Sequence, residues 1–95
     1  MMMHKYRLIR SAQFSKEVKR AKKRGLDMKK LDDVVDKLRN DIPLDIRHDD
    51  HPLRGQYKDF RECHITPDWL LIYKKHEDEL ILFLARTGTH SDLFH

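Results

Sequence analysis

Two continuous apolar runs, at residues 69–73 and 80–85, constrain the fold of this chain more than any other feature. Each predicts a strand that is covered on both faces, because a half-exposed strand would alternate polar and apolar residues. A short charged link at residues 74–78 separates the runs, and links of this length join antiparallel neighbours. A third strand, predicted at residues 60–65, precedes a turn at Pro67 and Asp68. These three strands are expected to form an antiparallel meander.

The N-terminal half of the chain predicts a strand followed by two helices. Residues 4–9 predict a first strand, expected at an edge of the meander. Ser11 is a suitable N-cap for the first helix, which ends at Gly25. Asp27 caps the second helix, which ends before Pro43. The apolar stripes of the two helices consist of Phe14, Val18 and Ala21, and of Met28, Leu31, Val34, Val35 and Leu38.

The short connection between the two helices predicts an antiparallel hairpin, which must cover one face of the sheet to bury both stripes. Residues 41–58, rich in proline, glycine, aspartate and histidine, predict an ordered loop that is pinned to the body by its few apolar residues. The predicted fold class is therefore α+β, with an N-terminal strand and an antiparallel helical hairpin packed on a small antiparallel sheet. With 95 residues, the chain is expected to form a single domain over residues 1–95.

Composition and charge narrow the class of partner. The chain carries 20 lysine and arginine residues against 16 acidic ones, and its predicted pI is about 9.3. A basic run at residues 16–24 suits a phosphate backbone or an acidic protein partner, although a solvated helix face is the alternative. No apolar run approaches a membrane span, and residues 1–7 do not resemble a signal peptide. With Cys63 as the only cysteine, we expect a cytoplasmic protein without an internal disulfide.

Polar residues suited to acid–base chemistry gather at the ends of the predicted strands. His64 and Asp68 flank the turn before one apolar run, and Arg86 and His90 follow the other. Because Trp69 begins one strand where Arg86 ends its antiparallel neighbour, both groups are expected at the same end of the sheet. Each residue also has a structural alternative. Arg86 is a possible ion-pair partner of Glu62 or Asp68, and Trp69 is a possible core residue.

This set of side chains fits the cleavage of RNA by its own 2′-hydroxyl, which needs a base, an acid and a cation. Histidine supplies acid and base near neutral pH, and arginine binds phosphate through paired N–H groups. Trp69 and Phe94 are candidates to stack on bases. A zinc site is a competing use, although the spacing matches no standard metal pattern. Its candidate ligands are His48, Asp49, Asp50, His51, His64 and His90.

Four segments, at residues 51–55, 60–65, 67–73 and 86–94, resemble in order the YafQ branch of the RelE/ParE toxin superfamily. The resemblance implies a RelE-like fold and a bacterial type II toxin, a ribosome-dependent mRNA endonuclease that needs no metal or other cofactor. Its implied partners are the 70S ribosome, mRNA and a cognate antitoxin of the DinJ/RelB kind. The toxin–antitoxin complex would bind operator DNA.

By this resemblance, the catalytic residues are His51, His64, Asp68, Arg86 and His90. His90 is the expected general acid and Arg86 the phosphate clamp, whereas the other three supply the base and the groups that tune it. The expected substrate-binding residues are Trp69, Phe94, Arg54, Lys19, Arg20 and Lys23, the last three as a contact with ribosomal RNA. Two alternatives remain: a non-catalytic ParE-like inhibitor of DNA gyrase, and a basic nucleic-acid-binding module.

Overall fold

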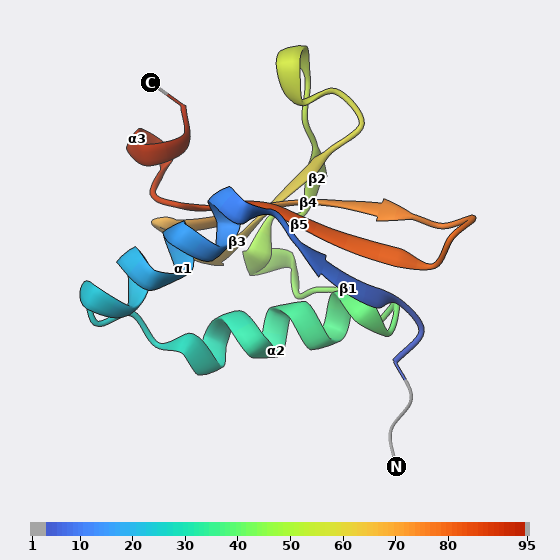
Figure 1. The fold of residues 1–95 in the computed structure, drawn as a ribbon, viewed down its shortest axis with the longest axis horizontal. Helices are drawn as coiled ribbons and strands as arrows, with labels where there is room; N and C mark the ends of the chain where they lie inside the picture. Colours follow the sequence, from blue (N-terminus) through green and yellow to red (C-terminus); the bar gives the residue numbers. More distant parts are fainter. Residues whose placement is uncertain (1–3, 95) are drawn as a thin grey trace.

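The computed structural model describes residues 4–94 and confirms the predicted α+β class (Figure 1). The elements in order are β1 (Arg7–Arg10), α1 (Ala12–Lys23), α2 (Met28–Arg39), the 3-10 helix η1 (Ile46–His48), β2 (His51–Pro52), the 3-10 helix η2 (Gly55–Tyr57), β3 (Arg61–Thr66), β4 (Trp69–His76), β5 (Ile81–Gly88) and α3 (His90–Leu93). Residues 1–3, which contribute to the signal-peptide prediction, and residue 95 lie outside the described part of the chain.

In the described residues the sheet has five strands in the order β1-β5-β4-β3-β2. The predicted antiparallel meander of β3, β4 and β5 is confirmed, and the short β2 adds to its far edge. β1 lies at the other edge, as predicted, but it pairs with β5 in the parallel direction. The sheet is therefore mixed rather than wholly antiparallel. Parallel neighbours need a long crossover connection, which the two helices and the chain after them provide between β1 and β5.

β4 is longer than the sequence predicts, because its charged end still packs against the sheet. The strand continues through residues 74–76, which were expected to form the turn. The ammonium group of Lys74 lies 5.6 Å from the ring centre of Phe60, and that of Lys75 lies 5.0 Å from the ring centre of Tyr6. The aliphatic stems of lysine cover apolar surface while the charge stays near water. Charged residues therefore extend this strand instead of ending it.

The predicted helix caps are present, and they explain where both helices begin. The Ser11 hydroxyl accepts a hydrogen bond from the Phe14 amide at 2.9 Å, and the Asp27 carboxylate accepts one from the Lys29 amide at 3.0 Å. Gly25, with φ of 80°, reverses the chain between the helices, in a conformation that favours glycine. Figure 1 shows α1 and α2 running in opposite directions, as the predicted hairpin requires.

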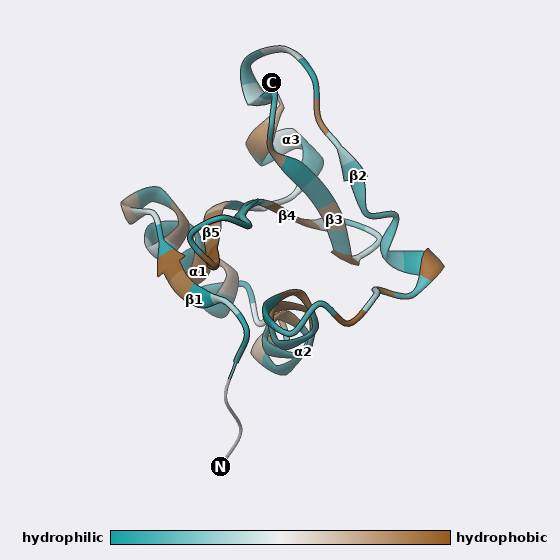
Figure 2. Cartoon of the chain, turned by 90° about the vertical axis from the view of Figure 1, so that its right-hand side faces the viewer, coloured by the Kyte–Doolittle hydropathy of each residue, from teal (hydrophilic) through white to brown (hydrophobic). Residues whose placement is uncertain are grey.

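The sheet separates two apolar clusters of described residues, so both faces of β4 and β5 are covered. The cluster under α1 and α2 contains the stripes of both helices and one set of alternating strand residues. The smaller cluster on the other face is formed by Leu70, Ile72, Ala85 and Leu93, with Leu53, Tyr57, Phe60, Phe83 and Phe94 packed against it. Figure 2 shows α2 on one side of the sheet, and the chain after β2 together with α3 on the other. The second face, which no long helix covers, is free to carry a functional site.

Asp41 joins the end of α2 to β4 and to the segment before β1, and it makes the stability of this corner depend on pH. Its carboxylate binds Lys5 and, at 2.6 Å, Lys75. The hydrogen bonds from these two lysines lower the pKa of Asp41 to about 2. A carboxyl group with a depressed folded-state pKa stabilises the fold above its ordinary pKa of about 4, and this contribution disappears as the pH falls through about 2.

Asp41→Asn should therefore lower the free energy of unfolding by roughly 1 kcal/mol at pH 7, and by much less at pH 2, since solvent screens this partly exposed group. Urea unfolding at pH 7, 4 and 2 measures the difference between variant and wild type. Asp32→Asn, at an exposed position on α2, is the matched control and should leave the pH dependence unchanged. An equal loss of unfolding free energy at all three pH values would contradict the conclusion that the charge of Asp41 stabilises the fold.

Candidate active site

The sheet face opposite α1 and α2 carries most of the predicted catalytic residues. Two neighbouring rows of residues cross the strands there. The first row consists of His51, Glu62, Ile72 and Arg86, and the second of His64, Leu70 and Gly88. Because alternate residues of a strand point to the same face, His51, His64 and Arg86 project on one side of the sheet. The prediction that the strand ends converge is confirmed for His64 and Arg86, and His51 joins them from β2, which was not predicted.

Two histidines that share one glutamate form one side of this face. His51 Nε2 lies 3.7 Å from Glu62 Oε1, and His64 Nε2 lies 3.6 Å from the same oxygen. The exposed carboxylate of Asp49 lies 3.7 Å from His51 Nδ1 and 3.8 Å from His64 Nε2. The Glu62 side chain is only 8% exposed, so its charge acts in a poorly solvated position. A buried carboxylate between two imidazoles orients both rings.

The tautomer of His51 follows from its other ring nitrogen. Nδ1 lies 2.6 Å from the backbone oxygen of Asp49, and a carbonyl oxygen only accepts, so Nδ1 carries the proton. In the neutral ring, Nε2 is then unprotonated and faces Glu62. An imidazole in this tautomer is prepared to take up a proton at Nε2.

Glu62 and Asp49 are site residues that the sequence analysis did not assign. Glu62 was considered only as a partner for Arg86, yet β4 lies between them. A signal was present, because Glu62 and His64 are two residues apart on a predicted strand and must share a face. Asp49 offered no such signal, since its position depends on how the loop at residues 41–58 folds.

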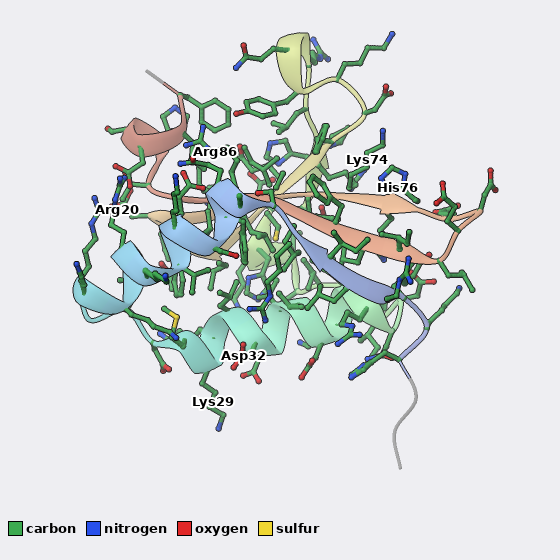
Figure 3. The ribbon with its side chains drawn as sticks, in the orientation of Figure 1. Arg20, Lys29, Asp32, Lys74, His76 and Arg86 are labelled. Atoms are coloured by element: carbon green, nitrogen blue, oxygen red, sulfur yellow. The ribbon has the colours of Figure 1, made fainter. Side chains whose placement is uncertain are left out.

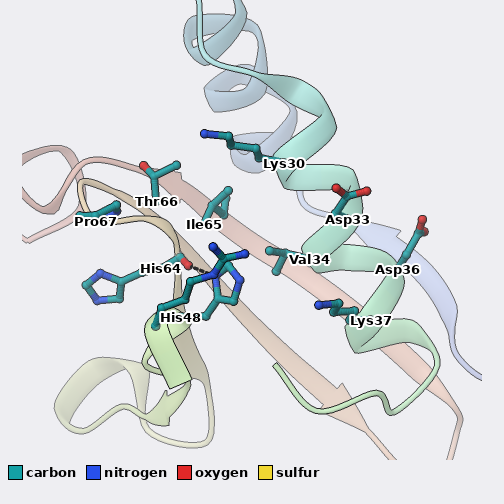
Figure 4. Close-up of a pocket in the computed structure, with 11 residues that line it drawn as sticks. Lys30, Asp33, Val34, Asp36, Lys37, His48, His64, Ile65, Thr66 and Pro67 are labelled. Atoms are coloured by element: carbon teal, nitrogen blue, oxygen red, sulfur yellow. Dashed lines mark hydrogen bonds between the residues drawn. The ribbon is translucent and has the colours of Figure 1, made fainter. Parts of the chain in front are cut away.

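The loop that carries His51 is attached to the sheet through His48. The buried His48 ring donates from Nδ1 to the backbone oxygen of His64 at 2.5 Å. Figure 4 shows this bond beside a groove of about 680 Å³ between α2 and the edge of β3, with the His64 ring pointing away from α2. This groove therefore lies behind the histidine pair and does not include its rings.

Asp50 provides a second attachment for the same loop. Its carboxylate accepts hydrogen bonds from the hydroxyl of the buried Tyr73 at 2.6 Å and from Arg61 Nε at 3.1 Å. Between the two anchors, Asp49 has φ of 44°, a left-handed conformation that a non-glycine residue adopts only when its surroundings hold it there. The prediction of an ordered loop attached to the body is confirmed. Of its aliphatic residues, however, only Leu44 and Leu53 pack against the clusters, whereas Ile46 is 94% exposed.

Arg86 provides a fixed cation on the other side of β4. The carboxylate of Glu17, from α1, accepts hydrogen bonds from Arg86 Nε at 3.1 Å and from Nη2 at 2.5 Å. The Tyr57 hydroxyl accepts one from Nη1 at 3.3 Å. These bonds, first that of Glu17, raise the pKa of Arg86, so its charge is permanent. Figure 3 shows Arg86 on the side of the sheet away from α2. Its ion-pair partner is Glu17, not Glu62 or Asp68.

The short helix α3 places His90 and Phe94 near Arg86. The Thr89 hydroxyl accepts from the Asp92 amide at 3.1 Å, and the Asp92 carboxylate accepts from the Thr89 amide at 3.0 Å, which forms a capping box. The His90 and Phe94 rings lie 5.1 Å apart, and Phe94 meets the edge of Tyr57 at 6.1 Å. α3 is an element not predicted from the sequence, although a threonine three residues before an acid is a known start signal.

Two predicted residues stand outside this group. Trp69 is 2% exposed in the cluster under the helices, and its indole N–H donates to Thr87 Oγ1 at 2.9 Å. The prediction that Trp69 stacks on a base is wrong for this structure, because its ring is covered. Asp68 is exposed in the β3–β4 turn and forms no ion pair within residues 4–94. It lies near Arg24, whose pKa is raised first by a hydrogen bond to Asp92 and in part by the Asp68 charge.

The remaining predicted contacts are exposed basic side chains. Arg54 precedes η2, and Lys19, Arg20 and Lys23 lie on the exposed side of α1. Arg20 points outward from α1 in Figure 3. Their roles stay predictions. Within the described residues, no helix is long and apolar enough to cross a membrane.

The alternative zinc site is not supported by the arrangement of its candidate ligands. His48 faces the groove behind the sheet, and His90 belongs to α3 beyond β5. Among residues 4–94, no group of three or more histidine, cysteine, aspartate or glutamate side chains is placed to hold a metal ion.

The face as a whole offers acid–base groups on both sides of an apolar floor. The His51–His64 pair lies over β2 and β3, and Arg86 and His90 lie over β5 and α3. β3 and β5 are roughly 10 Å apart across β4, so an anionic group above Leu70 would be within reach of both sides. Fold and site together define a small α+β protein with a candidate acid–base site built around an arginine.

Comparison with known proteins shows the family to which this chain belongs. Residues 6–95 match the family described as a bacterial toxin of type II toxin-antitoxin system, YafQ. The chain is 49% identical over 85 residues to the mRNA interferase toxin YafQ of Escherichia coli K12. The aligned stretch covers 88% of this chain and 90% of that protein. This chain belongs to the YafQ family of type II toxins, which confirms the resemblance noted from its motifs.

Solved structures of similar proteins support the same assignment. YafQ in the E. coli DinJ–YafQ toxin–antitoxin complex matches with a TM-score of 0.86 and 43% identity, over 96% of this chain and 99% of that chain. A metal-bound toxin from Helicobacter pylori matches with a TM-score of 0.89 and 46% identity, over 94% of this chain and 99% of that chain. The metal is a feature of that protein's structure, and the predicted RelE-like fold is confirmed by both.

Proposed function

We propose that this chain is an mRNA interferase, a ribosome-dependent endoribonuclease that cuts mRNA in the ribosomal A site and so inhibits translation. The observation that carries the proposal is the single sheet face that carries His51, His64 and Arg86, with His90 on α3, which follows β5 directly. The name of the E. coli relative supports the same activity. A substrate on translating ribosomes implies a cytoplasmic location.

The mechanism we propose uses the 2′-hydroxyl of the RNA as the nucleophile. His51 Nε2 removes the hydroxyl proton, because its tautomer leaves that nitrogen unprotonated. Glu62 holds the resulting imidazolium, and His64 positions Glu62 by contacting the same carboxylate oxygen. Arg86 stabilises the charge that develops on the phosphate, and His90, on the opposite side of β4, protonates the leaving 5′-oxygen. Asp68, exposed at the same end of the sheet, acts through its charge.

A translation reaction with purified protein tests this function. Primer extension should reveal cuts in phase with the codons, only when ribosomes are present, and equally after the protein has been stripped with EDTA. Loss of cutting after EDTA treatment would contradict the metal-free mechanism. Intact mRNA with inhibited DNA gyrase would instead support the ParE-like alternative. Binding of RNA with neither effect would support a plain binding module.

We also propose that a cognate antitoxin of the DinJ/RelB kind holds this toxin inactive and that their complex binds operator DNA. The related E. coli toxin is found in a complex with DinJ, and the net charge of +4 of this chain suits an acidic partner. An antitoxin that covers the basic surface of α1 would compete with ribosomal RNA for the same side chains.

Charge reversal on α1 should weaken ribosome binding without harming the fold. Changing Lys19, Arg20 and Lys23 to glutamate removes three exposed cations from the helix surface. Each phosphate contact that is lost makes binding weaker and less salt-dependent, so affinity should fall about 10- to 100-fold at moderate salt. Cosedimentation with 70S ribosomes measures the affinity, and circular dichroism checks the fold. Reversal of Lys29 and Lys30 on α2 is the matched control; unchanged cosedimentation of the α1 variant would exclude this contact.

Removing the hydroxyl of Tyr73 should loosen the loop that carries His51. Tyr73→Phe keeps the ring in the core but deletes the 2.6 Å hydrogen bond to Asp50. We expect mRNA cleavage to slow about 10-fold, because a displaced base loses its alignment with the 2′-hydroxyl. Tyr6→Phe, which deletes a 3.3 Å hydrogen bond to Asp41 away from the site, is the matched control. Both variants should lose about 1 kcal/mol of stability. An equal loss of activity in both would argue against a role for the anchor in positioning.

A further inference from the structure

The basic helix α1 buries its single acid against Arg86. Glu17 is 4% exposed, although the run at residues 16–24 is otherwise basic and solvated. It follows Phe14 by three residues and therefore lies on the buried stripe of the helix. A charged residue is rarely buried without a partner that requires it. The ion pair with Arg86 supplies that reason.

The backbone near Glu17 needs a hydrogen-bond acceptor but not a charge. β1 ends at Arg10, opposite Leu84, so β5 continues beyond the strand that pairs with it. Glu17 Oε1 accepts the Thr87 amide of this free edge at 3.1 Å. A neutral glutamine would satisfy the amide equally well. The negative charge is therefore explained by the guanidinium rather than by the sheet edge.

The contacts of Glu17 leave one particular edge of the guanidinium open. A guanidinium has five N–H donors in a fixed plane. Glu17 occupies the edge formed by Nε and Nη2, and Tyr57 accepts from Nη1. The edge formed by the second N–H groups of Nη1 and Nη2 is left to bind two oxygens of one anion, the paired geometry with which arginine recognises phosphate.

We propose that Glu17 is a positioning residue that holds Arg86 so that the Nη1–Nη2 edge of its guanidinium meets the scissile phosphate. The inference rests on the proposed function of this face as a ribonuclease site. Glu17 also partly neutralises Arg86 before RNA arrives. Its loss should therefore impair the alignment of phosphate in the transition state more than the binding of RNA in the ground state.

Single-turnover cleavage on programmed ribosomes tests this role with Glu17→Gln. The maximal rate should fall about 10- to 100-fold while the concentration for half-maximal rate changes less than about 3-fold. Glu17→Asp, which keeps the charge, should recover part of the rate. Glu79→Gln, at an exposed position in the β4–β5 turn, is the matched control and should match the wild type.

Two further measurements separate positioning from simple destabilisation. In an Arg86→Lys background, which lacks the planar fork, Glu17→Gln should slow cleavage less than about 3-fold further. An undiminished effect there, or a normal maximal rate per folded molecule in Glu17→Gln, would overturn the proposal. The Arg86 Nε–H signal in ¹⁵N NMR should be protected from exchange in wild type and lost in Glu17→Gln. If the wild type cuts no mRNA, the proposed function fails. If the NMR signal persists in Glu17→Gln, the proposal that Glu17 holds Arg86 in place is refuted.

Discussion

His90→Ala should slow mRNA cleavage by about 10²- to 10⁴-fold and leave the stability of the fold nearly unchanged. The proposed role of His90 is to protonate the leaving oxygen, and the other two histidines of the proposed site, His51 and His64, lie over β2 and β3 on the other side of β4. Its ring is exposed, and its aromatic neighbour is Phe94, so truncation removes little buried surface. Single-turnover rates and thermal unfolding measure the two effects separately.

His76→Ala is the matched control for that prediction. His76 ends β4 at the far end of the strand from Trp69, and Figure 3 shows it well away from Arg86. Its replacement should leave cleavage unchanged. His90→Ala should also flatten the alkaline limb of the pH–rate profile, because a general acid must be protonated to act. A His90→Ala rate within about 3-fold of wild type would remove His90 from the mechanism.

Arg86→Ala should impair both catalysis and folding, unlike His90→Ala. Removing the phosphate clamp should slow cleavage by about 10³-fold. It also leaves the Glu17 carboxylate, whose side chain is 3% exposed, without its cation. Breaking a fully buried pair costs about 3–5 kcal/mol, and because the Arg86 side chain is 26% exposed we expect about 2–3 kcal/mol. Urea unfolding at pH 7 and single-turnover cleavage measure these losses.

A second change distinguishes the two consequences of removing Arg86. Glu17→Gln in the Arg86→Ala background neutralises the isolated carboxylate while it keeps an acceptor for the Thr87 amide. About half of the lost stability should return, but none of the lost activity. If the free energy of unfolding of Arg86→Ala is within about 0.5 kcal/mol of the wild-type value, the ion pair does not stabilise the fold.

The features that local patterns dictate were predicted from the sequence. A short stretch of residues is enough to predict each of them: the caps at Ser11 and Asp27, the reversal at Gly25, and the two-sided burial of β4 and β5. The parallel direction of β1 does not follow from such a stretch, because four residues carry no signal for direction, and the crossover through both helices decides it. The two-residue β2 is likewise too short to show a period.

Of the candidate site, only the residues whose positions follow from strand pairing could be predicted from the sequence. Antiparallel pairing brought His64 and Arg86 to one end of the sheet, but the same reasoning included Trp69, which belongs to the opposite face. The partners of the predicted catalytic residues do not follow from strand pairing. Glu17 lies 69 residues before Arg86, and its only signal was an acid on an otherwise apolar stripe. Such long-range ion pairs depend on how helix and sheet pack.

The most direct test of the ribonuclease site is cleavage of an mRNA that carries a single 2′-deoxynucleotide at the scissile position. If the 2′-hydroxyl is the nucleophile, the deoxy substrate should stay intact on the ribosome. The all-ribose control should be cut to a product that ends in a 2′,3′-cyclic phosphate. Cleavage of the deoxy substrate at a normal rate, or a product with a 3′-hydroxyl and a 5′-phosphate, would contradict the acid–base mechanism assigned to His51, Arg86 and His90.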